Sequence, residues 1–83
     1  MDRVELKQKI LDLFAEVLPD IDFESSDTLV DDGIFDSISI VTAVSELSME
    51  FNVNFDINQL GAENLNSIES IVDTVLGLMN FKK

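Results

Sequence analysis

Three segments of this chain carry apolar residues at the spacing of an amphipathic helix, and they are separated by two segments with no sustained period. The periodic segments run over residues 3–17, 37–51 and 67–80. Their predicted buried residues are Leu6, Ile10, Leu13, Phe14, Val17, Ile40, Val41, Val44, Leu47, Phe51, Ile68, Ile71, Val72, Val75, Leu78 and Met79. Asp2 is the expected N-cap of the first helix. Pro19 ends that helix, because a residue before proline avoids the helical region.

The two aperiodic segments differ in length and content. Residues 19–36 contain the only proline, one of three glycines and a cluster of Ser and Asp, which indicates a long loop with a short turn near residues 27–30. A loop this long in a small domain is often functional. Residues 52–66 are irregular, with a one- or two-turn helix near 57–60, and Asn66 followed by Glu69 favours a capping box for the last helix.

These patterns predict an all-α fold, a small bundle of three long helices plus one short helix, with a long loop between helices one and two. The length of 83 residues corresponds to a single domain over residues 1–83. Because the chain has no Cys and no His, neither a disulfide nor a Cys/His metal site can support the core. No signal peptide or membrane span is visible, so we expect a cytoplasmic protein without stable membrane insertion.

The charge is strongly negative and unevenly distributed, with a formal net charge of -12. The five basic residues are Arg3, Lys7, Lys9, Lys82 and Lys83. Between residues 10 and 81 there is no Lys or Arg, whereas 15 of the 17 acidic residues, all but Asp2 and Glu5, lie there. This distribution excludes nucleic-acid binding and favours a monomer and a basic partner protein. The alternative is that the acidity only provides solubility.

The Asp36-Ser37 pair lies where the first loop gives way to the second helix. Ser37 falls in the first turn, near unpaired backbone amides and the positive end of the helix dipole, both of which would stabilise an attached phosphate. A serine hydroxyl without a positioned base is a weak nucleophile, and this chain has no His or Cys to activate it. The residues alone leave two interpretations: the pair merely caps the helix, or another enzyme attaches a group to Ser37.

Residues 33–38, Gly-Ile-Phe-Asp-Ser-Ile, resemble the attachment motif of acyl carrier and peptidyl carrier proteins. The resemblance covers nearly the whole chain, including its length, long first loop and acidic balance. It implies that Ser37 carries 4′-phosphopantetheine, taken from coenzyme A and held through a phosphodiester. It also implies that Asp36 assists the transferase as a magnesium ligand, that Ile38 contacts partner enzymes, and that Gly33 allows the turn before the helix. The family usually has leucine where this chain has Ile38.

A protein of this family is a carrier and not an enzyme. The resemblance implies that the chain holds acyl or aminoacyl groups as thioesters for a fatty acid, polyketide, nonribosomal peptide or D-alanine transfer pathway. The implied partners are a phosphopantetheinyl transferase, an acyl- or aminoacyl-activating ligase, and acyltransferases or synthases with basic docking surfaces. No resident metal is expected, because the acids around Gly33 do not match a calcium loop. The alternative is an unmodified acidic helical interaction module that binds a basic partner.

The outer face of the second helix distinguishes the branches of this family. Carriers of fatty-acid synthesis usually have a second Asp two residues after the serine and further acids along the helix. Here Ser39, Thr42 and Ser45 occupy that face, and the helix carries two charged residues. This face, together with Phe-Asn-Val at residues 51–53, resembles D-alanyl carrier and free-standing peptidyl carrier proteins. The cargo itself is chosen by the activating enzyme and is not encoded in this chain.

Overall fold

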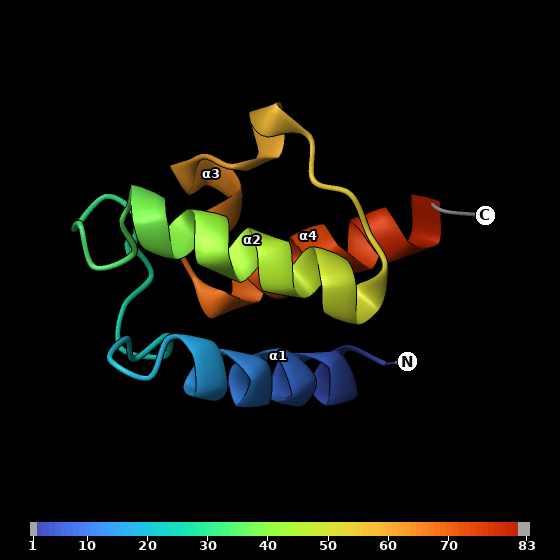
Figure 1. Cartoon of the computed structure of the whole chain (residues 1–83), viewed down its shortest axis with the longest axis horizontal. Coiled ribbons are helices and arrows are strands. Elements are labelled where there is room, and N and C mark those ends of the chain that lie inside the picture. Colours follow the sequence, from blue (N-terminus) through green and yellow to red (C-terminus); the bar gives the residue numbers. More distant parts are fainter. Residues whose placement is uncertain (1, 82–83) are drawn as a thin grey trace.

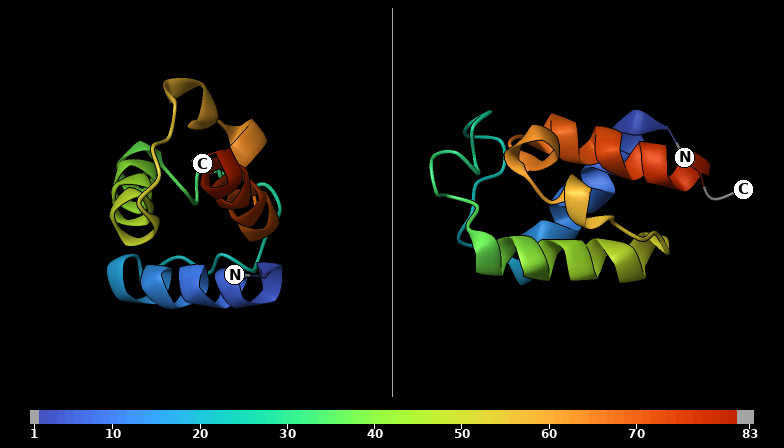
Figure 2. Two further views of the ribbon diagram at one scale, coloured as in Figure 1. Left: turned by 90° about the vertical axis from the view of Figure 1, so that its right-hand side faces the viewer. Right: turned by 90° about the horizontal axis from the view of Figure 1, so that it is seen from above.

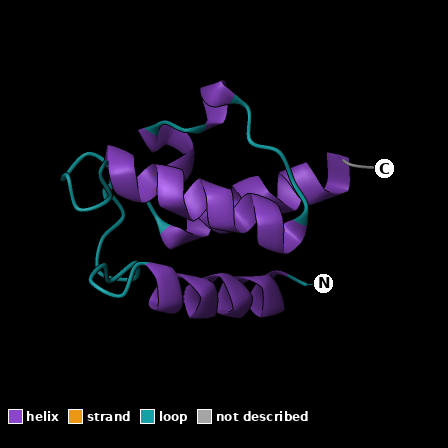
Figure 3. Ribbon diagram, in the orientation of Figure 1, coloured by secondary structure: helices purple, strands orange, loops and turns teal. Residues whose placement is uncertain are grey.

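The computed structural model describes residues 2–81, so Met1, Lys82 and Lys83 lie outside the described residues. Three long helices form the bundle: α1 (Arg3–Val17), α2 (Ser37–Phe51) and α4 (Ile68–Phe81). A 3₁₀ turn, η1 (Ile57–Gln59), and the one-turn helix α3 (Ala62–Leu65) lie between α2 and α4 (Figures 1 and 3). The predicted all-α bundle with a long first loop is therefore confirmed. The first two helices have the predicted limits, and α4 begins and ends one residue later than predicted.

The three long helices pack around one core. α2 and α4 run roughly alongside one another, and α1 crosses beneath both of them (Figures 1 and 2). The loop between α1 and α2 passes along one end of the bundle and delivers the chain to the first turn of α2 (Figure 1). This arrangement leaves one side of α2 facing away from the other helices.

The core draws on the first loop as well as on the helices. Its buried apolar side chains are Leu6, Ile10, Phe14, Phe23, Leu29, Phe35, Ala43, Leu47, Leu65, Ile68, Ile71, Val72 and Val75. Burying a Leu, Ile, Val or Phe side chain stabilises a fold by roughly 1.5–3 kcal/mol. Phe23, Leu29 and Phe35 all belong to the loop, so the loop is held by the same apolar burial that holds the helices together.

The buried face of α2 differs from the predicted one. Val41 was expected in the core, but its side chain is 63% exposed, whereas Ala43 and Leu47 are buried. Residues two positions apart on a helix point to nearly opposite sides, so Val41 and Ala43 cannot both face the core. α1 packs against α2, and Ala43 and Leu47 lie on the side of α2 that is buried. The partly buried apolar residues of α2 are Ile40, Val44 and Phe51.

The segment between α2 and α4 holds two short helical pieces rather than one. The predicted turn near residues 57–60 is present as η1, and α3 follows it in a stretch predicted to be irregular. Because α3 is one turn long and buries only Leu65, it leaves no periodic signal in the sequence. The predicted capping box at Asn66 is wrong. The Ser67 hydroxyl accepts the hydrogen bond from Ser70 N at 3.1 Å, and the Asn66 side chain bonds to the first loop instead.

Ion pairs join α1 to α4. Arg3 bonds to Glu69 and Asp73, and Lys7 Nζ lies 2.6 Å from a carboxylate oxygen of Glu69. Lys7 also lies 4.0 Å from Glu24 in the first loop. The hydrogen bonds from Lys7 and then Arg3 hold the pKa of Glu69 below its ordinary value. These pairs are largely exposed, so they are open to screening by salt.

Replacing Glu69 with glutamine should lower the melting temperature by a few degrees at neutral pH and low salt, because Arg3 and Lys7 lose their shared carboxylate. The pKa of Glu69 is lower in the folded chain than its ordinary 4.5, so its contribution is present above about that pH. The contribution is lost as the pH falls through the folded pKa. Thermal melts followed by circular dichroism at several pH values should therefore show the two proteins converging in acid.

Glu63→Gln is the matched control, because it removes one negative charge from an exposed residue of α3 that forms no ion pair within residues 2–81. It separates loss of the ion pairs from general relief of like-charge repulsion. Equal melting temperatures for the Glu69→Gln and Glu63→Gln variants at neutral pH and low salt would contradict the assigned role of Glu69.

Candidate functional site

The first turn of α2 is set by Asp36. This residue is extended, with φ -87° and ψ 178°, and its Oδ1 accepts a hydrogen bond from Ser39 N at 2.9 Å. It is therefore the N-cap of α2, which is one of the two roles that the residues alone left open for the Asp36-Ser37 pair. Hydrogen bonding to Ser39 holds the pKa of Asp36 below its ordinary value, so the carboxylate stays ionised at neutral pH.

Ser37 is the first residue of α2, and it is exposed. Because Asp36 supplies the cap, the Ser37 hydroxyl is not needed for it, and that hydroxyl makes no hydrogen bond to any residue within 2–81. A phosphodiester on Ser37 Oγ would lie next to first-turn amides and the positive end of the α2 dipole. The position thus fits an attached phosphate sterically and electrostatically.

Gly33 shapes the turn that precedes the site. Its φ is +78°, in the left-handed region, and a Cβ placed on it would meet nothing within 4 Å. The turn is closed by Asp32 N donating to Thr28 O at 2.8 Å and Gly33 N donating to Val30 O at 3.1 Å. Glycine is required here by its backbone conformation and not by close packing.

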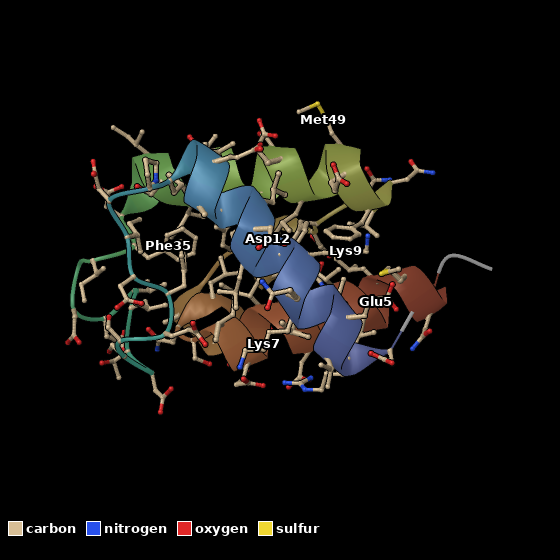
Figure 4. All side chains as sticks on the ribbon, turned by 90° about the horizontal axis from the view of Figure 1, so that it is seen from below. Glu5, Lys7, Lys9, Asp12, Phe35 and Met49 are labelled. Carbon is tan, nitrogen blue, oxygen red and sulfur yellow. The ribbon has the colours of Figure 1, made fainter. Side chains whose placement is uncertain are left out.

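Phe35 anchors the chain two residues before Ser37. Its side chain points into the bundle and is 1% exposed (Figure 4). Its ring meets that of Phe23 edge-on, with centroids 5.1 Å apart. Phe23 in turn packs on Phe14 of α1, with centroids 4.5 Å apart. Aromatic pairs of this geometry stabilise beyond their buried area. The start of α2 is therefore held against α1 through the loop.

Asn66 holds the loop that leads to the site, a role that the sequence did not predict. It lies between α3 and α4, yet its side chain accepts hydrogen bonds from Val30 N at 2.9 Å and Asp31 N at 3.1 Å. Its Nδ2 donates to Asp31 Oδ2 at 2.9 Å. These residues are 35 or more positions apart in the sequence, so no local pattern could have paired them.

Exposed apolar side chains line the outer face of α2. Ile38 is 79% exposed, as the resemblance implied, and Val41 and Met49 share its face at 63% and 71% (Figure 4, Met49 labelled). Ile34 in the loop and Ile57 in η1 are also exposed. We call Ile38, Val41 and Met49 the apolar face of α2.

The comparison with known proteins decides the family. Residues 8–75 match the family described as "Phosphopantetheine attachment site", which is most of the chain. The chain belongs to this family. The match includes the whole of α2 and the loop before it, so Ser37 and Gly33 both lie within it. As a member of the family, the chain is an acyl or aminoacyl carrier protein whose prosthetic group is a covalent 4′-phosphopantetheine.

Curated relatives of this carrier are D-alanyl carrier proteins. The protein of Streptococcus suis (strain 05ZYH33) is 28% identical over 78 residues, which is 93% of this chain and 99% of the relative. The protein of Streptococcus uberis is 30% identical over 76 residues, 90% of this chain and 96% of the relative. No solved structure matches the chain. Carriers of this family are generally non-catalytic, and within residues 2–81 no helix is long and apolar enough to span a bilayer.

Gly33→Ala should lower the free energy of unfolding by about 1–2 kcal/mol, the strain of placing a Cβ in the left-handed region. Gly77→Ala is the opposite control, because Gly77 lies inside α4, is exposed, and leaves open space for a Cβ. Alanine there should raise the free energy of unfolding by about 0.5–1 kcal/mol. Urea denaturation measures both, and equal effects of the two substitutions would contradict the conformational role of Gly33.

Proposed function

We propose that Ser37 Oγ is the atom that carries the phosphopantetheine, so that this residue is the functional centre of the carrier. The observation that supports the proposal is the exposed hydroxyl of Ser37, free of any hydrogen bond within residues 2–81, on the first residue of α2. In the transfer, the Ser37 oxygen forms a new bond to phosphorus, the diphosphate of coenzyme A breaks, and adenosine 3′,5′-bisphosphate leaves. The hydroxyl proton goes to a base of the transferase, because this chain has no His or Cys to take it.

Asp36 is proposed to assist the transferase from the adjoining position. Its Oδ1 accepts a hydrogen bond from Ser39 N at 2.9 Å, and the residue is exposed. The lowered pKa keeps the group ionised, and a carboxylate oxygen is a preferred ligand of Mg²⁺. Asp36 can therefore cap the helix with one oxygen and face a magnesium ion of the transferase with the other.

When bound, the group supplies a thiol on a flexible arm, which holds the cargo as a thioester. The chain itself contributes a rigid base for that arm, since Phe35 is buried and Asp36 caps α2. A tether of this kind raises the concentration of the cargo at each partner's active site. The reactions on the cargo are then carried out by the partners, and we propose that the chain catalyses none.

The proposed partners are the transferase, an activating ligase and an acyltransferase or synthase. They would meet the apolar face of α2 beside the acidic loop, so a complementary partner surface is apolar with a basic rim. Similarity over nearly full length to D-alanyl carrier proteins supports D-alanine as the cargo. We propose that the chain acts as a monomeric domain over residues 1–83 in the cytoplasm.

Intact mass is the direct test of the Ser37 assignment. After incubation with coenzyme A, magnesium and a broad-specificity phosphopantetheinyl transferase, the native chain should gain one phosphopantetheinyl group, and the Ser37→Ala variant should gain none. Offering the modified protein D-alanine or a fatty acid, each with ATP and a matching ligase, should then favour D-alanine. No gain by a folded native chain would favour the unmodified interaction module, and a gain by Ser37→Ala would move the site elsewhere.

Asp36→Asn separates the charge of this residue from its capping role. Asparagine caps a helix as well as aspartate does, so the melting temperature should stay close to that of the native chain. The rate of phosphopantetheine transfer should nevertheless fall on the order of 10- to 100-fold, as when carboxylates around a metal are removed. Asp36→Ala should lose both rate and melting temperature. A native transfer rate in Asp36→Asn would refute the magnesium-facing role.

A further inference from the structure

We propose that Asn66 is a positioning residue for the Ser37 site, and that its amide group latches the loop before α2 to the junction of α3 and α4. This proposal rests on the assignment of Ser37 as the modified residue. It concerns a residue 29 positions away in the sequence, outside the attachment motif. The observation that carries it is the set of hydrogen bonds that this one residue makes to three consecutive loop residues.

The hydrogen bonds of Asn66 use every polar group it has. Its backbone O accepts from Leu29 N at 2.8 Å, and its Oδ1 accepts from both Val30 N at 2.9 Å and Asp31 N at 3.1 Å. Its Nδ2 donates to Asp31 Oδ2 at 2.9 Å. Its own N donates to Ala62 O at 3.0 Å, which ties Asn66 to α3. The loop is thus bonded to a residue whose own backbone is held by a helix.

A short path leads from this latch to the site. Leu29 O accepts the hydrogen bond from Phe35 N at 2.9 Å. Leu29, which is bonded to Asn66, is therefore also bonded to Phe35, two positions before Ser37. The side chains of Leu29 and Phe35 are both buried in the core. Residues 29–35 therefore form a closed turn with both ends fixed, and the direction in which the chain enters α2 is set by it.

Three of the bonds go from the loop backbone to Asn66, so they specify the shape of the loop whatever its side chains are. Without them, residues 29–35 would sample other conformations, and a partner would meet the competent one only part of the time. The apparent affinity of a partner falls in proportion to the fraction of competent molecules. Loss of the latch should therefore weaken recognition of the carrier more than it slows the transfer step.

With Asp31 opposite it, the latch also requires an amide at position 66. A side chain there must accept from two backbone N–H groups and donate to the carboxylate of Asp31, and asparagine has both an acceptor and a donor. Asn66→Asp would place two carboxylates against each other. Exchanging the two residues, as Asn66→Asp with Asp31→Asn, would restore a donor and an acceptor in reversed positions.

The test is the kinetics of phosphopantetheine transfer to the chain, with carrier concentration varied, coenzyme A and magnesium saturating, and a broad-specificity transferase. Asn66→Ala and Asn66→Asp should each raise the KM for the carrier by about five- to tenfold, the effect of losing roughly one net hydrogen bond, with kcat little changed. The exchanged double variant should return toward the native KM. Asn58→Ala, at an exposed residue of η1, is the control and should behave as the native chain does.

Rescue by the exchanged pair is a result that a general loss of stability would not produce. An unchanged KM in Asn66→Ala, a fall in kcat at unchanged KM, or a double variant no better than Asn66→Asp would overturn the proposal.

Amide hydrogen exchange of the native chain is a second test, and it does not depend on whether any variant folds. Val30 and Asp31 should exchange more slowly than Asp27, whose amide donates to no residue within 2–81, and equal rates would also overturn the latch.

The two proposals fail in different ways. If the native chain takes up no phosphopantetheinyl group, the assignment of Ser37 is wrong, and the exchange rates of Val30 and Asp31 still decide whether Asn66 holds the loop. If the native chain is modified at Ser37 and the Asn66 variants are modified with native kinetics, the function stands and the positioning role of Asn66 does not.

Discussion

The contact of Phe35 with the core is the interaction on which the rest of the site depends. Phe35 packs edge-on against Phe23, and Phe23 packs on Phe14 of α1, so three rings connect the first helix to the entrance of the second. Each ring buries a large apolar area, and the edge-on geometry adds to the attraction. Because Phe35 cannot leave the core without losing this burial, Asp36 and Ser37 are held at the end of the bundle where the chain turns into α2.

The charged residues that form ion pairs between helices are largely different from the acidic residues of the loop and of α2. Two of the basic residues, Arg3 and Lys7, are engaged with Glu69 and Asp73 of α4, which joins α1 to α4. Apart from Glu24, which lies 4.0 Å from Lys7, the acidic residues of the loop and of α2 form no ion pair within residues 2–81. An acidic surface beside an apolar helix face fits the proposed partner surface, which is apolar with a basic rim.

The predictable parts of the site are those that depend on close neighbours in the sequence. A cap at Asp36-Ser37 could be anticipated because the bond from Ser39 N to the Asp36 carboxylate spans three residues, and the turn at Gly33 because the attachment motif implies it. The limits of α1 and α2 follow in the same way, from Pro19, the capping residues and the apolar period. α3 and the true cap of α4 were missed, since a one-turn helix has no period and Asn66 is occupied by a distant loop.

The sequence by itself therefore determined the helical class, the limits of the first two helices, and the place of a serine in the first turn of the second helix, directly after an aspartate. These features arise from backbone propensities and hydrogen bonds that span four residues or fewer. The tertiary structure decided which side of α2 is buried, with Ala43 inside and Val41 outside, and which residue holds the loop. The first depends on how α1 packs against α2, and the second on how the junction of α3 and α4 meets the first loop. Contacts between segments so far apart in the chain leave no local pattern.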